Sequence, residues 1–320
     1  MIWKNVGPSL AGLAIATLLS ASAAQAGGDR DGRIAFIKGS DVYSVEPDGS
    51  NVRQLTSLGS DRVAALPSWE PSGDQIVYTL SSPMVSVFPD ILAQLWIMDA
   101  HGRNQHRLLD DPEHENTAGT FSPDGKSVAF SRCDMRGACG IYQVRVDGTG
   151  LTAITELQSG HFHWSPMYSP NGLKIAFERR WPDGTSGVFV VDRDGSHIQR
   201  LTPAGIAARQ PIWSPDGSRI AFSCRCDATG TSGIWVTDCD GKALTRLTNV
   251  HAMDALAAVD HQFPSWSPGG NFLVVEQSRP GSDAAIVIVY IMQPGLLHQR
   301  TNQLLLGSQP SWSPGPKRGN

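Results

Sequence analysis

The sequence predicts an all-β protein, a six-bladed β-propeller with four antiparallel strands in each blade. The first observation is a hairpin unit, clearest at residues 211–222, in which two short apolar stretches flank Ser214-Pro215-Asp216-Gly217. Proline presets φ, aspartate bonds its own backbone and glycine accepts a positive φ, so this tetrapeptide favours a tight turn. The second observation is that the unit recurs every 45–53 residues, a period typical of propellers and solenoids.

The other copies share the turn and an aromatic anchor before it. They occupy residues 67–78, 119–130, 166–177 and 264–275, with a truncated copy at 310–315. The anchors are Trp69, Phe121, Tyr168, Trp213, Trp266 and Trp312. Because each copy supplies two strands, each anchor is expected on the first, innermost strand of a blade.

Two further strands follow each hairpin. Third strands are expected at residues 95–99, 141–144, 188–192, 234–238 and 286–291. Most of these end in an Asp-Gly or His-Gly turn, and short fourth strands follow at residues 107–109, 199–202, 245–248 and 302–306. Four strands in each repeat give one propeller blade.

The two ends of the chain carry complementary halves of the unit. Residues 33–36 form a second half without a first, and residues 310–315 form a first half without a second. We therefore expect one blade to be built from both termini, with residues 311–313 as its innermost strand and residues 33–56 as the other three. Such a shared blade closes the ring and leaves no strand edge unpaired.

The first 26 residues have the pattern of a cleaved secretory signal. Lys4 precedes the short apolar run at residues 10–19, and Ala24-Gln25-Ala26 forms a small-residue cleavage site. The run is shorter than a membrane span. We expect residues 27–320 to be a monomeric propeller, periplasmic or secreted, with no membrane insertion after signal removal. A net charge of −4 argues against a nucleic-acid partner.

The repeats resemble the propeller domain of TolB and the wider family of WD-repeat-like exported bacterial β-propellers. The resemblance rests on the hairpin units above and on the Asp-x-Asp-Gly units that end in Leu-Thr, at residues 192–202 and 238–248. It implies a general role as a periplasmic protein-binding ring. TolB has an α/β domain before its propeller that engages the TolA side of the Tol system. Here the repeats begin a few residues after the expected cleavage site, so a TolA-type role is not implied.

Strand alternation places two kinds of connection on opposite faces of the ring. The first-to-second and third-to-fourth turns are short and uniform, and we call their side the turn face. The other connections are longer, and we call their side the loop face. Long loops on a rigid scaffold commonly carry binding residues. In the loop at residues 80–93, the apolar side chains either pack on the ring or meet a partner. The candidate partner-binding residues are Met84, Val85, Val87 and Phe88.

A second candidate site is the channel mouth on the loop face. Residues three positions before each motif Pro or Gly are expected to enter the channel, and Asn116, His163 and His261 are the polar ones. Arg209 follows Ala208, which holds the corresponding position in another repeat. These four residues form a candidate ligand site. The alternative is a water-filled channel that happens to be lined by polar groups.

Enzymatic motifs are missing from the sequence. His114-Glu115 lacks the second histidine of a zinc protease, and no G-x-S-x-G nucleophile motif occurs. No cofactor is expected, although His161 with His163 and His261 could hold a divalent metal. The carboxylate pairs Asp192/Asp194 and Asp238/Asp240 could bind Ca²⁺ weakly, but turn formation explains them better.

The predicted function is therefore a non-enzymatic scaffold that binds an envelope protein or cell-wall component. The alternative is a propeller lyase or hydrolase that acts on a saccharide through the histidines of the channel mouth.

Five cysteines in an exported chain predict oxidation. Cys133 and Cys139 flank a short hairpin loop and are expected to form a disulfide. Cys224 and Cys226 could pair locally under strain. Cys239 is expected to stay free, since no cysteine of its own blade lies within reach.

Overall fold

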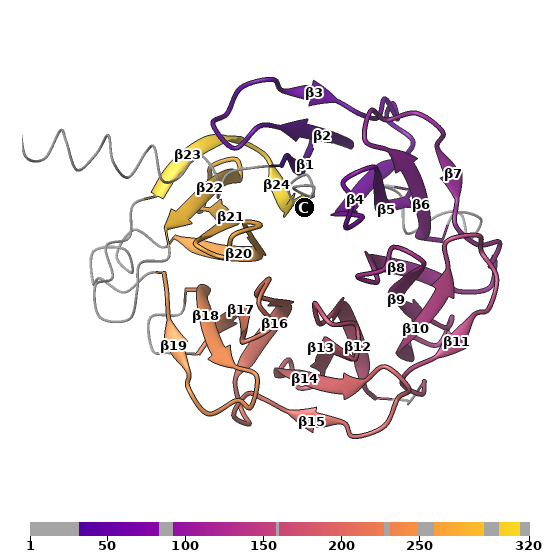
Figure 1. The fold of residues 1–320 in the computed structure, drawn as a ribbon, viewed down its shortest axis with the longest axis vertical. Helices are drawn as coiled ribbons and strands as arrows, with labels where there is room; N and C mark the ends of the chain where they lie inside the picture. Colours follow the sequence, from indigo (N-terminus) through magenta and orange to yellow (C-terminus); the bar gives the residue numbers. More distant parts are fainter. Residues whose placement is uncertain are drawn as a thin grey trace, which may run out of the picture.

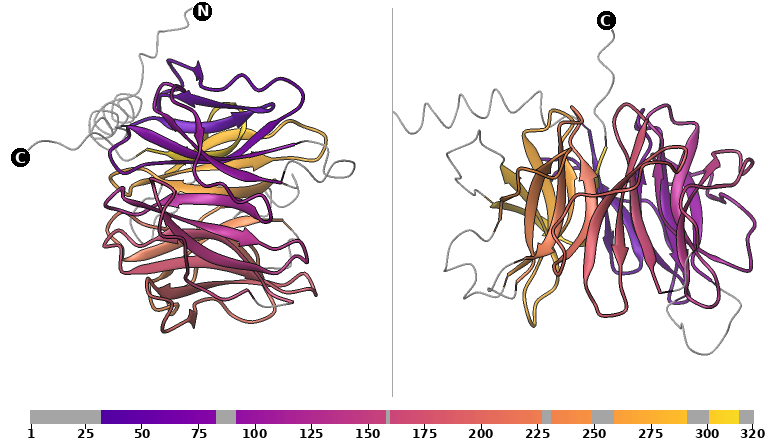
Figure 2. Two further views of the ribbon diagram at one scale, coloured as in Figure 1. Left: turned by 90° about the vertical axis from the view of Figure 1, so that its right-hand side faces the viewer. Right: turned by 90° about the horizontal axis from the view of Figure 1, so that it is seen from below.

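A computed structural model describes residues 32–82, 92–157, 160–226, 231–248, 259–290 and 301–313. Within these residues every regular element is a β-strand. Figure 1 shows the strands grouped around a central axis, with β4, β8, β12, β16, β20 and β24 nearest the centre. Seen from the side, the strands run from one face of this ring to the other (Figure 2). The predicted all-β, propeller-like architecture is confirmed.

The strands form antiparallel groups of four, which we call blades and number by chain order. Blade 1 contains β24 (Ser308–Trp312), β1 (Ile34–Lys38), β2 (Asp41–Val45) and β3 (Arg53–Gln54). Blade 2 contains β4 (Val63–Trp69), β5 (Gln75–Ser81), β6 (Gln94–Asp99) and β7 (His106–Arg107). Blade 3 contains β8 (Glu115–Phe121), β9 (Ser127–Cys133), β10 (Cys139–Arg145) and β11 (Thr152–Ala153).

The remaining groups follow the same order from the centre outward. Blade 4 contains β12 (Phe162–Tyr168), β13 (Lys174–Arg180), β14 (Ser186–Asp192) and β15 (Gln199–Arg200). Blade 5 contains β16 (Ala207–Trp213), β17 (Arg219–Arg225), β18 (Gly233–Asp238) and β19 (Thr245–Arg246). Blade 6 contains β20 (Asp260–Trp266), β21 (Phe272–Ser278), β22 (Ala285–Tyr290) and β23 (Thr301–Leu306). Single parallel pairings, Cys139 with Phe162 and Ser186 with Ala207, join blades 3, 4 and 5 into one twelve-stranded sheet.

The two ends of the described chain meet in blade 1. Strand β24 pairs antiparallel with β1, so that Trp312 lies opposite Ile34 and Ser311 opposite Ala35. The innermost strand begins at Ser308, three residues earlier than the sequence pattern predicts. The outer strands are shorter than expected, since β3, β7, β11, β15 and β19 each pair over two residues.

The hydrophobic core lies between neighbouring blades. Each cluster of buried side chains combines residues from two blades, as where Phe177 of blade 4 packs with Ala129 and Ile141 of blade 3. The aromatic anchors all contribute to these clusters and are at most 7% exposed. A single blade has no core of its own, so each depends on its neighbours for stability.

The Asp-Gly turns of the outer strands also belong to this packing. Gly195, at φ +89°, has the left-handed conformation that favours glycine. A Cβ at this position would lie 2.6 Å from the carbonyl oxygen of Ile154 in the neighbouring blade. Glycine is required here for both the backbone conformation and the close approach of the two blades.

Candidate functional site

A central cavity of about 110 Å³ lies between the innermost strands of the ring, and we call it the channel. Its wall consists of three successive positions from each innermost strand. These are Leu66–Pro67–Ser68, Ala118–Gly119–Thr120, Ser165–Pro166–Met167, Gln210–Pro211–Ile212, Phe263–Pro264–Ser265 and Gln309–Pro310–Ser311. All of these side chains are uncharged, so the channel wall favours a neutral segment over a free ion.

Each channel strand contains a backbone irregularity at the first of its three wall positions. The residues Leu66, Ala118, Ser165, Gln210, Phe263 and Gln309 all have φ between +49° and +55°. Register shifts occur at the same places in the ladders to the second strands. These features define a β-bulge, which adds one residue and redirects the side chains around it. Holding a non-glycine residue in this region costs about 1–3 kcal/mol, so the surrounding contacts must stabilise it.

Hydrogen bonds between blades supply part of that stabilisation. The bulge N–H of Ala118 donates to Thr79 Oγ1 of blade 2 at 3.1 Å, and that of Phe263 donates to Gln210 Oε1 of blade 5 at 3.1 Å. The bulge N–H of Leu66 donates to Gln309 Oε1 of blade 1 at 2.7 Å. The side chain of one blade therefore fixes the channel backbone of the next.

Glu178 makes the most elaborate of these connections. It is fully buried, and its Oε2 accepts the bulge N–H of Gln210 at 3.3 Å. Its Oε1 contacts Arg180 and lies 3.8 Å from Nε of Arg209. Arg180 in turn lies 5.4 Å from the ring of Trp164. A buried carboxylate needs such compensating partners, and here they link the channel-wall residue Gln210 to Arg180 and Arg209.

Glu276 occupies the corresponding position in blade 6. Its Oε2 accepts the N–H of Gln309 at 3.1 Å, which ties blade 6 to the innermost strand of blade 1. Burial raises the pKa of Glu276 above its usual value of 4.5, and the hydrogen bond from Gln309 opposes this only in part. The sequence signal for both residues is a glutamate that directly follows the apolar residues within its strand, after Phe177 in β13 and after Val275 in β21.

Three of the four predicted ligand residues do not line the channel. Asn116, His163 and His261 are at most 2% exposed. Asn116 donates to Gln94 Oε1 at 3.1 Å, and His261 Nε2 lies 3.0 Å from Gln277 Nε2. The expected placement is wrong because the bulge reverses the alternation of the strand, which turns these side chains into the blade. A ligand-binding role for them stays a prediction.

Arg209 is placed differently from the other three. It precedes the bulge residue Gln210, and its side chain is 42% exposed. Of the four predicted ligand residues, Arg209 lies next to the channel wall in the structure. It contacts Glu178, which accepts the N–H of the wall residue Gln210. Its Nε has no hydrogen-bond partner among the described residues.

His163 is a buried, neutral imidazole. Burial, followed by the charge of Arg179, lowers its pKa to about 3. Nε2 accepts from Nε of Arg179 at 2.9 Å, so Nδ1 carries the proton that Thr155 Oγ1 accepts at 2.8 Å. Both ring nitrogens of His163 are therefore engaged in hydrogen bonds within the protein. Across the described parts of the chain, no group of three or more His, Cys, Asp or Glu side chains has the arrangement of a metal site.

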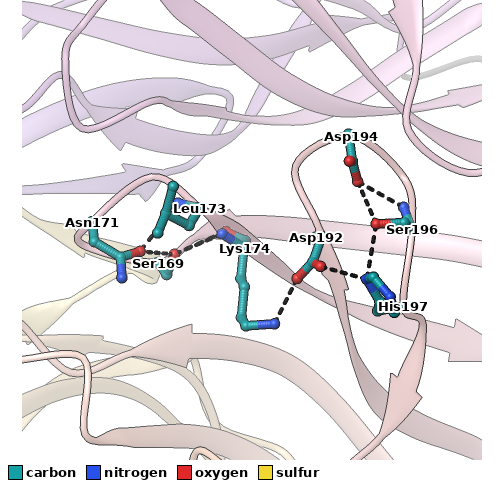
Figure 3. A network of polar contacts seen from close by, with 8 residues as sticks. All are labelled: Ser169, Asn171, Leu173, Lys174, Asp192, Asp194, Ser196 and His197. Atoms are coloured by element: carbon teal, nitrogen blue, oxygen red, sulfur yellow. Dashed lines mark hydrogen bonds and ion pairs between the residues drawn. The ribbon is translucent and has the colours of Figure 1, made fainter.

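The acidic turns are held by local hydrogen bonds. Asp194 accepts the N–H and hydroxyl of Ser196 at 2.9 and 2.6 Å, and Asp192 contacts Lys174 Nζ at 2.6 Å and His197 Nδ1 at 2.8 Å (Figure 3). The pKa values of both carboxyls lie below their usual range, chiefly because of the side-chain hydrogen bonds from Lys174 and Ser196. These carboxylates serve turn formation, as the sequence pattern suggests.

The cysteines have defined states within the described residues. Cys133 and Cys139 lie opposite each other in the hairpin ladder, with Cα atoms 4.1 Å apart, and form a disulfide. Cys224 and Cys226 also form a disulfide, whereas Cys239 is free and exposed.

Two sets of sequence predictions lie outside the described residues. They are the signal at residues 1–26 and the partner-binding residues Met84, Val85, Val87 and Phe88. In the part of the chain that is described, no helix is long and apolar enough to cross a membrane.

The chain is similar to known propellers in both sequence and structure. Residues 158–316 match the family model described as the TolB beta propeller domain. TolB from Acinetobacter baumannii superposes with a TM-score of 0.70 at 21% identity, covering 97% of this chain and 74% of that one. A putative TolB from Agrobacterium tumefaciens gives 0.67 at 21% identity, covering 89% and 95%.

Enzymes share the fold at lower identity. An oligogalacturonate lyase from Vibrio parahaemolyticus superposes with a TM-score of 0.53 at 14% identity, covering 82% of this chain and 75% of the lyase. A search of curated proteins found no match. At these identities the likeness to the lyase and to the TolB structures is one of fold. Together with the match over residues 158–316, it supports a place for the chain in the TolB-like β-propeller family.

Proposed function

We propose that this protein is a periplasmic or secreted binding ring that recognises an envelope protein or a cell-wall component without catalysing a reaction. The channel is the proposed binding site, approached from the loop face. The loop with Met84, Val85, Val87 and Phe88 is proposed to add apolar contacts to the same partner. We further propose that the mature protein, residues 27–320, is a monomer.

The observation that carries this proposal is the construction of the channel wall. Uncharged side chains line it, and repeated left-handed bulges shape its backbone. Strained, precisely supported backbone next to an open cavity is typical of binding sites. Arg209 and Arg180 at the mouth add polar anchors around the buried Glu178. A cavity with an apolar wall and a few placed polar groups suits an inserted segment of a partner.

We also propose that the ring has six blades and is closed by the pairing of β24 with β1. A closed ring has no free inner edge, so a partner can enter the channel without opening the sheet. The hydrogen bond from the N–H of Gln309 to Glu276 supports this proposal, because it joins the last inner strand to blade 6.

The saccharide lyase alternative receives less support from the geometry. It requires histidines at the channel mouth, whereas His163 and His261 are buried within separate blades. Arg179 and Thr155 already occupy the ring of His163. The likeness to oligogalacturonate lyases concerns the fold and supplies no catalytic residue.

Affinity capture from an envelope extract tests the binding proposal. Immobilised mature protein is compared with a Ser68→Trp variant, which fills the channel, and with a Leu173→Trp variant. Leu173 is 66% exposed in the turn between β12 and β13, on the turn face, and serves as a control that also introduces a tryptophan. We expect the control to retain the same partner as the wild type, and Ser68→Trp to lose it. Equal retention by both variants would contradict a channel site.

A further inference from the structure

Two arginines of blade 4 share one aromatic ring. The Cζ atom of Arg179, from β13, lies 4.5 Å from the ring centroid of Phe189. The Cζ atom of Arg200, from β15, lies 5.7 Å from the same centroid. Both side chains are partly exposed, so a ligand can reach them from solvent.

Neither guanidinium has a carboxylate partner among the described residues. Arg179 donates from Nε to Nε2 of the neutral His163 at 2.9 Å. Arg200 donates from Nε and Nη2 to the carbonyl oxygens of Thr202 and Pro203, both at 2.8 Å. These partners orient the two groups but supply no negative charge to either of them.

The neighbouring blade shows what a compensated site looks like. Arg132 holds the same position in blade 3 and lies 5.1 Å from the ring of Tyr142. Its Nε donates to Oδ2 of Asp111 at 2.8 Å. Asp111 precedes the buried Asn116 by five residues, and the residue five before His163 is Gln158. Blade 4 therefore keeps the arginine and its aromatic support, but its sequence has no carboxylate at the corresponding position.

The electrostatics of the pair agree with this comparison. Burial, followed by the charge of Arg200, lowers the pKa of Arg179 below its usual value. Burial also lowers the pKa of Arg200. Two like charges held close together in a partly desolvated position repel each other, and a bound anion would relieve this repulsion.

The backbone is shaped to hold Arg200 in place. Gly187 lies opposite Arg179 in the ladder between β13 and β14. A Cβ at Gly187 would lie 3.1 Å from both Nε and Nη2 of Arg200. Trp181 borders the site, with its ring centroid 5.0 Å from the Cζ atom of Arg200. The absence of a side chain at Gly187 leaves room for the guanidinium to lie across the strand.

We propose that Arg179 and Arg200 form an oxyanion-binding site that takes a phosphate or carboxylate group of an envelope molecule. A guanidinium offers two parallel N–H donors that match the oxygens of either group. The ring of Phe189 makes a cation–π contact with both guanidinium groups, and the hydrogen bond to His163 fixes the orientation of Arg179. The site is separate from the channel and makes a second contact point on the ring.

Isothermal titration calorimetry of the mature protein with inorganic phosphate, and separately with acetate, tests this site. Arg179→Gln is expected to weaken binding about tenfold or more, since it removes charge-assisted hydrogen bonds. Arg246→Gln is the matched control, because Arg246 lies over Trp235 in blade 5 as Arg200 lies over Trp181. Blade 5 has Cys224 where blade 4 has Arg179, so this control should bind like the wild type.

A second variant guards against a folding defect. Gly187→Ala keeps both charges but displaces Arg200, and it should also weaken binding while thermal unfolding shows a folded protein. Binding of phosphate alone or acetate alone identifies which group the site takes. Failure of the wild type to bind either anion, or equal affinity in Arg179→Gln and Arg246→Gln, would overturn the proposal. The Ser68→Trp variant should bind the anion normally, which separates this site from the channel.

Discussion

Ile34 and Trp312 lie opposite each other in an antiparallel ladder, although one stands near the start of the described chain and the other near its end. Trp312 is buried and donates its N–H to Ser265 Oγ of blade 6 at 2.9 Å. The next residue, Ser313, accepts from the N–H of Arg33 at 2.8 Å through its hydroxyl oxygen. Blade 1 is thus built from both ends of the described chain, and it is hydrogen-bonded to blade 6.

The first prediction concerns this closing strand. Deletion of residues 310–320 removes Trp312 and exposes the inner edge of β1. Loss of a buried tryptophan alone costs about 3–5 kcal/mol, which corresponds to a fall in the unfolding midpoint of about 10 °C. Circular dichroism during heating measures this change. Truncation after Ser313 is the control and should leave the midpoint close to that of the wild type. An unchanged midpoint in the longer deletion would contradict ring closure by β24.

The second prediction concerns Glu276. Its pKa is raised in the folded state, so the folded protein binds a proton more tightly than the unfolded chain does. Stability therefore falls as the pH rises from 4.5 through the folded pKa. Glu276→Gln keeps an acceptor for the N–H of Gln309 but cannot ionise. Its unfolding midpoint should exceed that of the wild type at neutral pH and approach it below pH 4.5.

Thermal unfolding across a pH series checks this prediction. Glu113→Gln, at an exposed residue, is the control and should track the wild type throughout. A Glu276→Gln midpoint that falls below that of the wild type at neutral pH would contradict this prediction. It would show that the charge of Glu276 stabilises the contact between blade 6 and the innermost strand of blade 1.

The hairpin units were predictable because their signals are local. The signals are Trp213, the proline and glycine of the following turn, and the short apolar run near the start of strand β17. All of them lie within twelve residues of one another in the sequence. The six buried anchors and the pairing of the two termini follow from repetition of that pattern. Turn chemistry and side-chain period act over a few residues, so a single sequence contains them in full.

The channel was not predictable in the same way. The bulge at Gln210 is stabilised by Glu178, which comes from the preceding blade and lies 32 residues earlier in the chain. Regular alternation placed His163 in the channel, whereas the bulge turns it into the blade and leaves Ser165, Pro166 and Met167 on the wall. An inserted residue that depends on a partner in another blade leaves no periodic signal in its own strand.

The third prediction concerns the cysteines. The Cys133–Cys139 disulfide closes a short hairpin, so its removal in a double serine variant should cost about 2 kcal/mol of unfolding free energy. Urea unfolding measures this loss. Peptide mapping without reduction should recover these two residues linked, and a thiol reagent should label the exposed Cys239 in the folded protein. Free thiols at Cys133 and Cys139 would contradict the register of the hairpin.

The fourth prediction concerns His163, whose folded pKa of about 3 lies well below the ordinary histidine value of 6.5. Between these values the unfolded chain binds a proton that the folded protein does not, so stability rises with pH through this window. For one group the slope is at most about 1.4 kcal/mol per pH unit. His163→Asn introduces the residue that blade 3 carries at the same position, Asn116, which does not titrate. Its unfolding free energy, measured by urea titration, should depend less steeply on pH between 3 and 6.5. A slope equal to that of the wild type would mean that His163 is protonated in the folded protein and that Arg179 has a different partner.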